Sequence, residues 1–165
     1  MQGADHEIRV VASLLDRLID QEPKSTRDVL PTRAQTVRAL RDAVQRDLDE
    51  LLNTRNSFAD LSADFVEAGQ SVLTYGLPDF SALAGRDRNR LRQMLESAIR
   101  TFEPRLTGVS ATIIATERPD RAPSLREPIR IRIEARLVMD PSPEAVAFDV
   151  MMPVTNGSIE VRERE

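Results

Sequence analysis

Glu96 and Glu103, two glutamates in the middle of the chain, have a spacing that could support acid–base chemistry. They are seven residues apart, so an α-helix would place them about two turns apart, near the same side. Glycoside hydrolysis needs two carboxyl groups that face each other across a cleft, one of them with a raised pKa. Glu96 instead flanks an apolar stripe and has arginines on either side in the sequence, which is the setting of a solvated helix residue. We therefore do not expect this pair to catalyse hydrolysis.

The composition lacks the residues for other catalytic or metal-binding sets. The 165 residues include no cysteine and one histidine, His6, so disulfides, thiolate ligands and a second histidine ligand are excluded. There is no glycine-rich phosphate loop, and the sequence shows no Ser-His-Asp set that the single histidine, near the N-terminus, could serve. We expect neither a metal nor a cofactor.

The charge and hydropathy patterns point to a protein of the cytoplasm. The net charge of −4 gives no reason to expect nucleic-acid binding. Lys24 is the only lysine, and the many arginines suit carboxylate pairing at protein interfaces, although a GC-rich genome would also favour them. No apolar run approaches the about 20 residues that span a membrane. The N-terminus lacks the basic start and apolar core of a signal peptide.

Glu103 also belongs to a second constellation, the Glu-Pro-Arg junction formed by Glu103, Pro104 and Arg105. Apolar residues recur every three or four positions from Asp87 onward, which predicts a helix with one core-facing stripe. Pro104 ends this helix because it lacks an amide donor, so Glu103 is the last helical position. The proline prevents a helical i to i+4 pair, and we expect Glu103 and Arg105 to find separate partners. Two roles stay open: an internal ion-pair network, or contact with a neighbouring protein. The stripe consists of Leu91, Met94, Leu95, Ala98, Ile99 and Phe102.

A longer helix is predicted before this one. Thr32 and Gln35 fit a capping box at its start, and Asn53 can end it in a left-handed conformation. The connection at residues 56–86 is too apolar for a solvated loop, and we expect it to be pinned on the core. Its apolar residues are Val72, Leu73, Tyr75, Leu77 and Phe80, and the helix stripe is Val37, Leu40, Val44, Leu48 and Leu51.

After Pro104 the apolar period changes from about 3.6 to 2, which predicts strands. The clearest strand spans residues 129–139, with one apolar and one charged face, as in an antiparallel sheet covered on one side. Further strands are predicted at 109–115 and 146–154. The pair Asn156 and Gly157 then predicts a tight turn into a last strand through Ile159 and Val161. This charged terminal strand is an expected sheet edge, either blunted by its charges or open to a partner strand.

The sequence thus predicts an α+β fold, with two main helices followed by a mostly antiparallel sheet of about four strands. We assign residues 32–165 to one domain and residues 1–31 to a short N-terminal amphipathic segment with a charged connector. In that segment Leu14, Leu15 and Leu18 cluster on one side. They could pack on their own domain or dock into a groove on a partner, and both alternatives stay open.

Four stretches, in the same order, resemble the TssE family, the small baseplate subunit of bacterial type VI secretion systems. They are Ser-Leu-Leu-Asp-Arg-Leu at 13–18, Leu-Leu-Asn-Thr-Arg at 51–55, the stretch 72–81, and the stretch 98–106 with its Glu-Pro-Arg signature. That family is similar to a wedge subunit of contractile phage tail baseplates, whose relatives were long labelled lysozyme-like. The resemblance covers most of the chain.

The resemblance implies a structural, non-enzymatic subunit in a cytoplasmic baseplate docked at the inner membrane. It would link the wedge proteins TssF and TssG, contact the adaptor TssK, and nucleate the sheath of TssB and TssC. We interpret three sets of residues as partner-binding: Glu103, Pro104 and Arg105; Leu14, Leu15 and Leu18; and the strand edge at Ile159 and Val161. A phage tail or tailocin wedge protein is the alternative in the same class. A lysozyme-like peptidoglycan hydrolase is the alternative in another.

Overall fold

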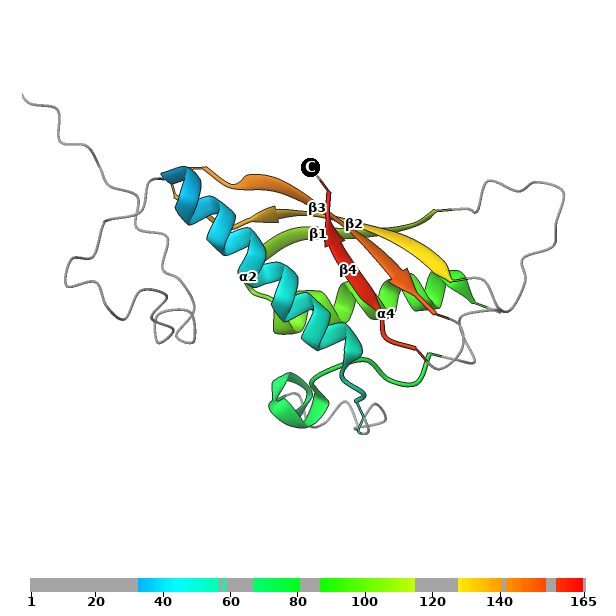
Figure 1. The fold of residues 1–165 in the computed structure, drawn as a ribbon. Helices are drawn as coiled ribbons and strands as arrows, with labels where there is room; N and C mark the ends of the chain where they lie inside the picture. Colours follow the sequence, from blue (N-terminus) through cyan, green and yellow to red (C-terminus); the bar gives the residue numbers. More distant parts are fainter. Residues whose placement is uncertain are drawn as a thin grey trace, which may run out of the picture.

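In the part of the chain that the structure describes, two α-helices, two short 3-10 helices and a four-stranded antiparallel sheet make up the fold (Figure 1). The computed structural model describes residues 33–56, 58, 67–80, 87–114, 128–140, 142–153 and 157–164. The predicted α+β class, with two helices ahead of the sheet, is confirmed. The segment 1–31 and its division from the domain lie outside the described residues. The elements are α2 (Arg33–Asn53), η1 (Ala68–Gln70), η2 (Val72–Thr74), α4 (Arg88–Phe102), β1 (Leu106–Ile114), β2 (Ile129–Leu137), β3 (Glu144–Met152) and β4 (Glu160–Glu163).

The sheet is a meander in the order β1-β2-β3-β4, so β1 and β4 are its edges. The central pair is regular, since every residue of β2 from Ile129 to Leu137 faces a partner on β3. The register of β1 against β2 shifts between Thr107 and Ser110, where Gly108 takes a φ of +63°. A left-handed φ of this kind favours glycine, and the irregularity bends the strand as it leaves the junction.

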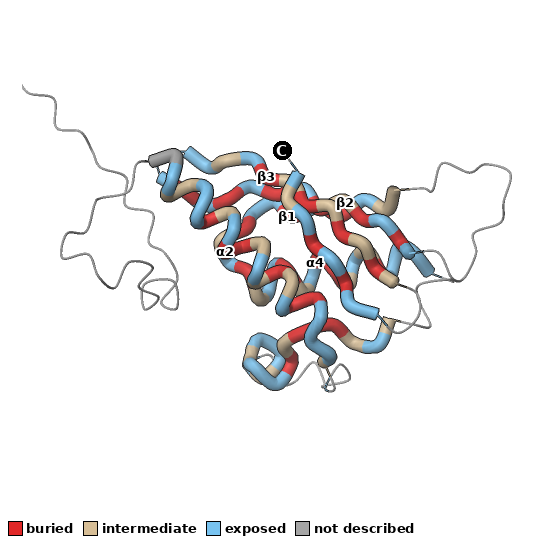
Figure 2. The backbone as a smooth tube through the Cα atoms, viewed as in Figure 1, coloured by how far each residue is buried: buried red, intermediate tan, exposed pale blue. Residues whose placement is uncertain are grey.

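One face of the sheet is buried and the other is exposed to solvent, as the period-2 pattern predicts. On β2, Ile131, Ile133 and Leu137 are fully buried, whereas Arg130, Glu134 and Arg136 are exposed. The buried side chains form one core with the apolar stripes of α2 and α4 (Figure 2). The helices therefore cover the apolar face, α4 against β1 and α2 against β4.

The C-terminal end of α2 differs from the prediction. Asn53 is not left-handed, because no described residue other than glycine has a positive φ. Its amide instead bonds across the molecule, where Nδ2 donates to the carbonyl of Ile159 at 2.9 Å and Oδ1 accepts from the amide of Ile159 at 2.8 Å. The asparagine thus serves tertiary packing in place of a local cap.

Helix α4 begins and ends close to the predicted positions. The Asp87 carboxylate caps its start by accepting from the amide of Arg90 at 2.9 Å. Phe102 is the last helical residue, and Glu103 closes the final turn by donating its amide to the carbonyl of Ile99 at 2.8 Å. Pro104 and Arg105 then turn the chain directly into β1.

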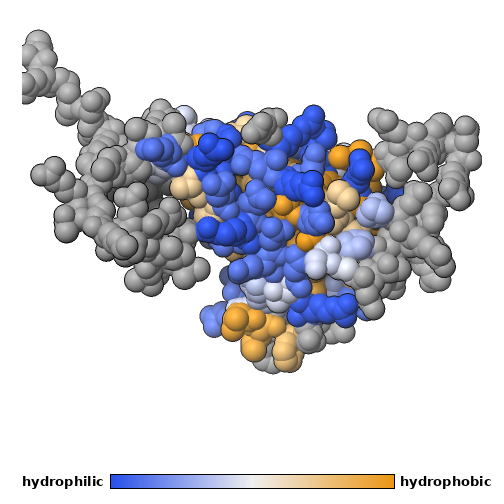
Figure 3. Space-filling model, in the orientation of Figure 1, coloured by the Kyte–Doolittle hydropathy of each residue, from blue (hydrophilic) through white to orange (hydrophobic). Residues whose placement is uncertain are grey.

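The described part of the connection between the helices is pinned on the core by Leu77, with the partly buried Tyr75 and Phe80 packed against it. Leu77 is buried and bonds with the backbone just after α2, through Thr54 and Asn56. Not all of its apolar residues share in this packing, because Val72 is 86% exposed and Leu73 is 55% exposed. Figure 3 shows hydrophobic surface at the lower end of the molecule, where η2 lies in Figure 1.

Candidate functional site at the Glu-Pro-Arg junction

Glu103 and Arg105 bind each other across Pro104. Arg105 Nε donates to Glu103 Oε1 at 2.7 Å, Arg105 Nη2 donates to Glu103 Oε2, and the amide of Arg105 lies 3.2 Å from Oε1. The prediction of separate partners is wrong, because the turn at Pro104 brings positions i and i+2 to the same side. The result is a bidentate pair, which fixes the guanidinium plane as well as its charge.

A third residue, Asp47 from the middle of α2, joins the pair. Arg105 Nη2 forms a hydrogen bond and ion pair with Asp47 Oδ2. The backbone carbonyl of Arg105 also accepts from the amide of Val138, just after β2, at 2.8 Å. The junction therefore ties together α2, the end of α4, the start of β1 and the end of β2.

Burial differs among the three members of the junction. Glu103 is only 3% exposed, Arg105 is half-buried, and Pro104 is exposed. Hydrogen bonding to Glu103 raises the pKa of Arg105 above its ordinary value, although burial opposes this, and Asp47 raises it further. The guanidinium is therefore permanently charged. Its Nη1 is buried and has no hydrogen-bond acceptor in the part of the chain that the structure describes.

The junction borders an open depression of about 340 Å³. An edge-to-face contact between Tyr75 and Phe102, with ring centroids 5.3 Å apart, forms part of its wall. Burial raises the pKa of the Tyr75 hydroxyl, and the carboxylates of Glu50, Asp47 and Glu103 raise it further. The depression thus combines apolar walls with a fixed cation. Its lining residues are Asp47, Leu51, Tyr75, Phe102, Glu103, Pro104 and Arg105.

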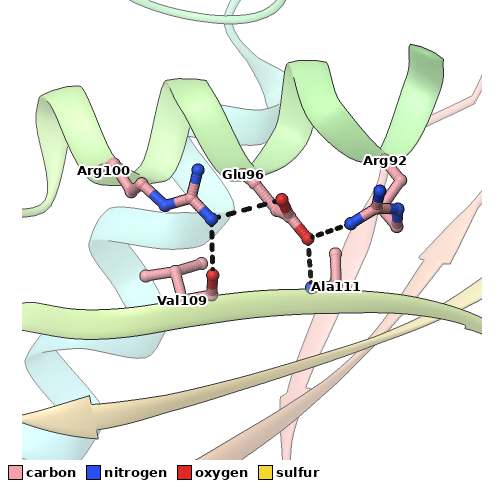
Figure 4. A network of polar contacts seen from close by, with 5 residues as sticks. All are labelled: Arg92, Glu96, Arg100, Val109 and Ala111. Atoms are coloured by element: carbon pink, nitrogen blue, oxygen red, sulfur yellow. Dashed lines mark hydrogen bonds and ion pairs between the residues drawn. The ribbon is translucent and has the colours of Figure 1, made fainter. Parts of the chain in front are cut away.

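Glu96 is buried and is not the solvated helix residue that its sequence context predicted. Figure 4 shows its carboxylate between Arg92 and Arg100 and against β1. Oε1 accepts from Arg92 Nη1 at 2.8 Å and from the amide of Ala111 at 2.9 Å, and Oε2 accepts from Arg100 Nη2 at 3.2 Å. Burial alone would raise the pKa of Glu96, but the Ala111 amide and the two guanidiniums together lower it. A general acid needs the opposite shift.

The other predicted partner-binding residues lie elsewhere. Ile159, just before β4, and Val161, within it, have buried side chains, and neither lines the depression at the junction. Leu14, Leu15 and Leu18 fall outside the described residues. Among the described residues no group of three potential ligands could hold a metal ion, and no helix is long and apolar enough to cross a membrane.

The model of one protein family, described as baseplate wedge protein gp25, matches residues 38–142. The chain belongs to this family. No curated protein and no solved structure matches it significantly. The match begins within α2, covers the connection with η1 and η2, α4, the junction, β1 and β2, and ends before β3. The gp25 family is a family of structural baseplate proteins that interact with other baseplate proteins, and it includes TssE.

Sequence analysis of this gp25 family member missed Asp47 as a part of the junction. A signal for it exists, because Asp47 lies three residues after Val44 and four before Leu51, beside the apolar stripe of α2. A charge in that position needs a partner from the packed side of the helix. The sequence does not show that the partner is Arg105, which is 58 positions away.

Proposed function

We propose that this protein is the TssE-type baseplate subunit of a type VI secretion system, with a structural and non-enzymatic role. It joins the wedge proteins TssF and TssG, contacts the adaptor TssK, and gives the sheath proteins TssB and TssC a surface on which polymerisation starts. The baseplate itself works in the cytoplasm, docked at the inner membrane. The gp25 family match and the four TssE-like stretches support this assignment.

The arrangement of Arg105 is the observation that carries the proposal. Its guanidinium is held rigidly by Glu103 and Asp47, yet its buried Nη1 has no acceptor among the described residues. Buried donors in native proteins are nearly always hydrogen-bonded. The Arg105 side chain as a whole is 25% exposed, so a carbonyl or carboxylate of a neighbouring wedge protein would approach it beside the exposed Pro104 and the apolar wall of the depression. A small rotation of the guanidinium would then present the buried Nη1 to this acceptor. Such a preformed site loses little entropy on binding.

Two further contacts belong to the proposal. The N-terminal residues Leu14, Leu15 and Leu18 dock into an apolar groove of a partner, in the helix-in-groove mode. The β4 edge at Ile159 and Val161 pairs with a strand of the sheath. In the subunit as described, these edge groups already bond with side chains of α2, so strand pairing there requires those side chains to move away.

The test distinguishes the role of the Glu-Pro-Arg junction as an internal ion pair from its role in binding a partner. Arg105→Ala removes both functions, whereas Pro104→Asp places a charge on the exposed part of the junction and leaves Glu103 and Arg105 intact. Pro143→Asp is the matched control, because Pro143 is also an exposed proline and lies outside the junction. Sheath formation is followed in cells with a fluorescent sheath subunit, alongside the abundance and Tm of each variant.

We expect normal Tm and abundance for Pro104→Asp but loss of sheaths, with Pro143→Asp like the wild type. Normal sheaths in a folded Pro104→Asp variant would remove the junction from the interface. Co-purification with TssF and TssG distinguishes a secretion system from a phage tail or tailocin, which the gp25 description also fits. Clearing of peptidoglycan by the wild type that is lost in Glu103→Gln would establish the hydrolase alternative instead.

A further inference from the structure

Side chains of α2 occupy outward-facing backbone groups of the edge strand β4 and of Ile159, the residue just before it. Asn53 bonds with both the amide and the carbonyl of Ile159, at 2.8 and 2.9 Å. Asp49 Oδ1 accepts from the amide of Val161 at 3.0 Å, and Gln45 Nε2 donates to the carbonyl of Val161 at 3.0 Å. These four backbone groups are the ones that a fifth strand would use. Helix α2 thus takes the place of that strand.

The match between helix and strand follows from their repeats. Four residues of a helix rise about 6 Å and two residues of a strand rise about 6.8 Å, so successive helix turns can stay beside an edge strand. Asn53 bonds with Ile159, while Asp49 and Gln45, on the next two turns, both bond with Val161. One turn earlier on α2, Arg41 continues the series by forming ion pairs with Glu144 on β3 and Glu163 on β4. We call this series, Arg41, Gln45, Asp49 and Asn53, the polar stripe of α2.

The opposite edge of the sheet is closed in a similar way by α4. The amide of Ala111 donates to Glu96, and the carbonyl of Val109 accepts from Arg100 Nη2 at 2.8 Å (Figure 4). Unpaired backbone groups at a sheet edge are templates for association with another chain. In the part of the chain that the structure describes, both edges therefore carry helix side chains where such association would begin.

We propose that the polar stripe of α2 prevents β4 from pairing with β4 of a second copy of this chain. The charges of β4 identify a second copy as the partner. In an antiparallel pair centred on Val161, Glu160 of each copy would face Arg162 of the other, and opposite charges in facing positions stabilise such a pair. Both side chains are exposed, and the ion pair that they form with each other at 3.0 Å would be exchanged for pairs between the two copies. The pairing is two-fold symmetric and closes after two copies.

The first test opens the edge. The double variant Asp49→Ala/Asn53→Ala removes the partners of three of the four backbone groups, and its mass is measured by analytical ultracentrifugation over a range of concentrations. The control is Asp42→Ala, an exposed aspartate on the same helix that gives the same change in net charge. We expect a monomer for the wild type and for Asp42→Ala, and a concentration-dependent dimer for the double variant. A folded double variant that remains a monomer would overturn the proposal.

Two further measurements identify the edge as the cause. Adding Arg162→Glu to the double variant places like charges opposite each other, so the dimer should dissociate. A dimer that persists would mean association through another surface. Hydrogen exchange of the backbone amides in the wild type tests the edge without any variant. The side-chain partners of Ile159 and Val161 should slow the exchange of these two amides about tenfold or more. Exchange at the rate of an unstructured peptide would equally overturn the proposal.

Discussion

Arg105 binds Glu103 with two nitrogens, and this geometry needs a guanidinium. Glu103 has almost no access to water, so Arg105→Ala leaves a buried carboxylate without its cation. We expect Arg105→Ala to lower the free energy of unfolding by about 2–4 kcal/mol. Arg105→Lys keeps the charge but offers one compact ammonium, and we expect it to recover less than half of the loss. Urea unfolding measures both.

The exposed pair of Arg162 and Glu160 is the control for this prediction. Its side chains are 75% and 56% exposed, so Arg162→Ala should change the free energy of unfolding by no more than about 0.5 kcal/mol. Equal losses for Arg105→Ala and Arg162→Ala would show that the Glu-Pro-Arg ion pair adds no stability. The bidentate geometry of Glu103 and Arg105 would then have to be explained by binding alone.

Glu96 makes the stability of the fold depend on pH. Its pKa is lowered in the folded state, so the unfolded chain takes up the proton first as the pH falls. The stabilisation is therefore complete above the ordinary pKa of a glutamate and is lost as the pH falls through the folded-state value. At pH 7 we expect Glu96→Gln to be less stable by about 1–3 kcal/mol, because it weakens bonds with two guanidiniums.

Urea unfolding of the wild type and of Glu96→Gln, at pH values from neutral downward, measures this dependence. The difference between the two proteins should narrow as the pH falls, since the wild type loses the carboxylate charge that the variant already lacks. Glu134→Gln, on the exposed face of β2, should differ from the wild type by no more than about 0.5 kcal/mol. A difference that stays constant with pH would contradict the role assigned to Glu96.

The polar contacts of single residues were the least predictable part of the molecule. The sequence indicated that Glu103 and Arg105 matter, because a proline has to end the helix there. It did not indicate that they bind each other, since helical spacing rules do not apply across a turn. Glu96 looked solvated for a related reason: its arginine neighbours are visible in sequence, but the amide of Ala111 comes from a strand 15 residues later.

At the level of elements, Gly76 holds the connection between the helices against the end of α2. Its φ is +104°, and a Cβ at this position would lie 2.4 Å from the carbonyl oxygen of Thr54. We expect Gly76→Ala to destabilise the protein by about 2 kcal/mol or more, through backbone strain and the clash. Gly69→Ala is the control, because nothing lies within 4 Å of its Cβ. Thermal unfolding that is equally affected by both substitutions would refute this role.

Helices and strands were predicted well wherever the apolar residues of a segment follow a single period. The alternation in β2 and the stripe of α4 each follow from burial of one face, which depends only on neighbours in sequence. The state of the β4 edge could not be predicted in this way. Its backbone partners come from Asn53, Asp49 and Gln45, more than 100 residues earlier, and no local pattern reports such contacts. The sequence correctly indicated an edge strand but not that α2 closes it.

At the scale of the molecule, the described residues form one core, which is shared by both α-helices and all four strands. Helices α2 and α4 both bury their apolar stripes against the same face of the sheet. Neither helix nor the sheet would therefore keep its apolar side chains buried if the others unfolded. A domain of this kind should unfold in one cooperative transition. The side chain that best tests this is Phe148 on β3, which is fully buried.

We expect Phe148→Ala to lower the free energy of unfolding by about 3–5 kcal/mol, because it removes a large buried ring and leaves a cavity. Circular dichroism, which follows the helices, and the chemical shifts of β2 amides, which follow the sheet, should report the same shifted midpoint in urea. Ala145→Gly on the exposed face of β3 is the control, and its loss should stay near about 1 kcal/mol. Helices that survive after the sheet has unfolded would contradict the single transition and would show that α2 is stable without β4. In that case its polar stripe could leave β4 without unfolding, and a sheath strand could replace it at little cost.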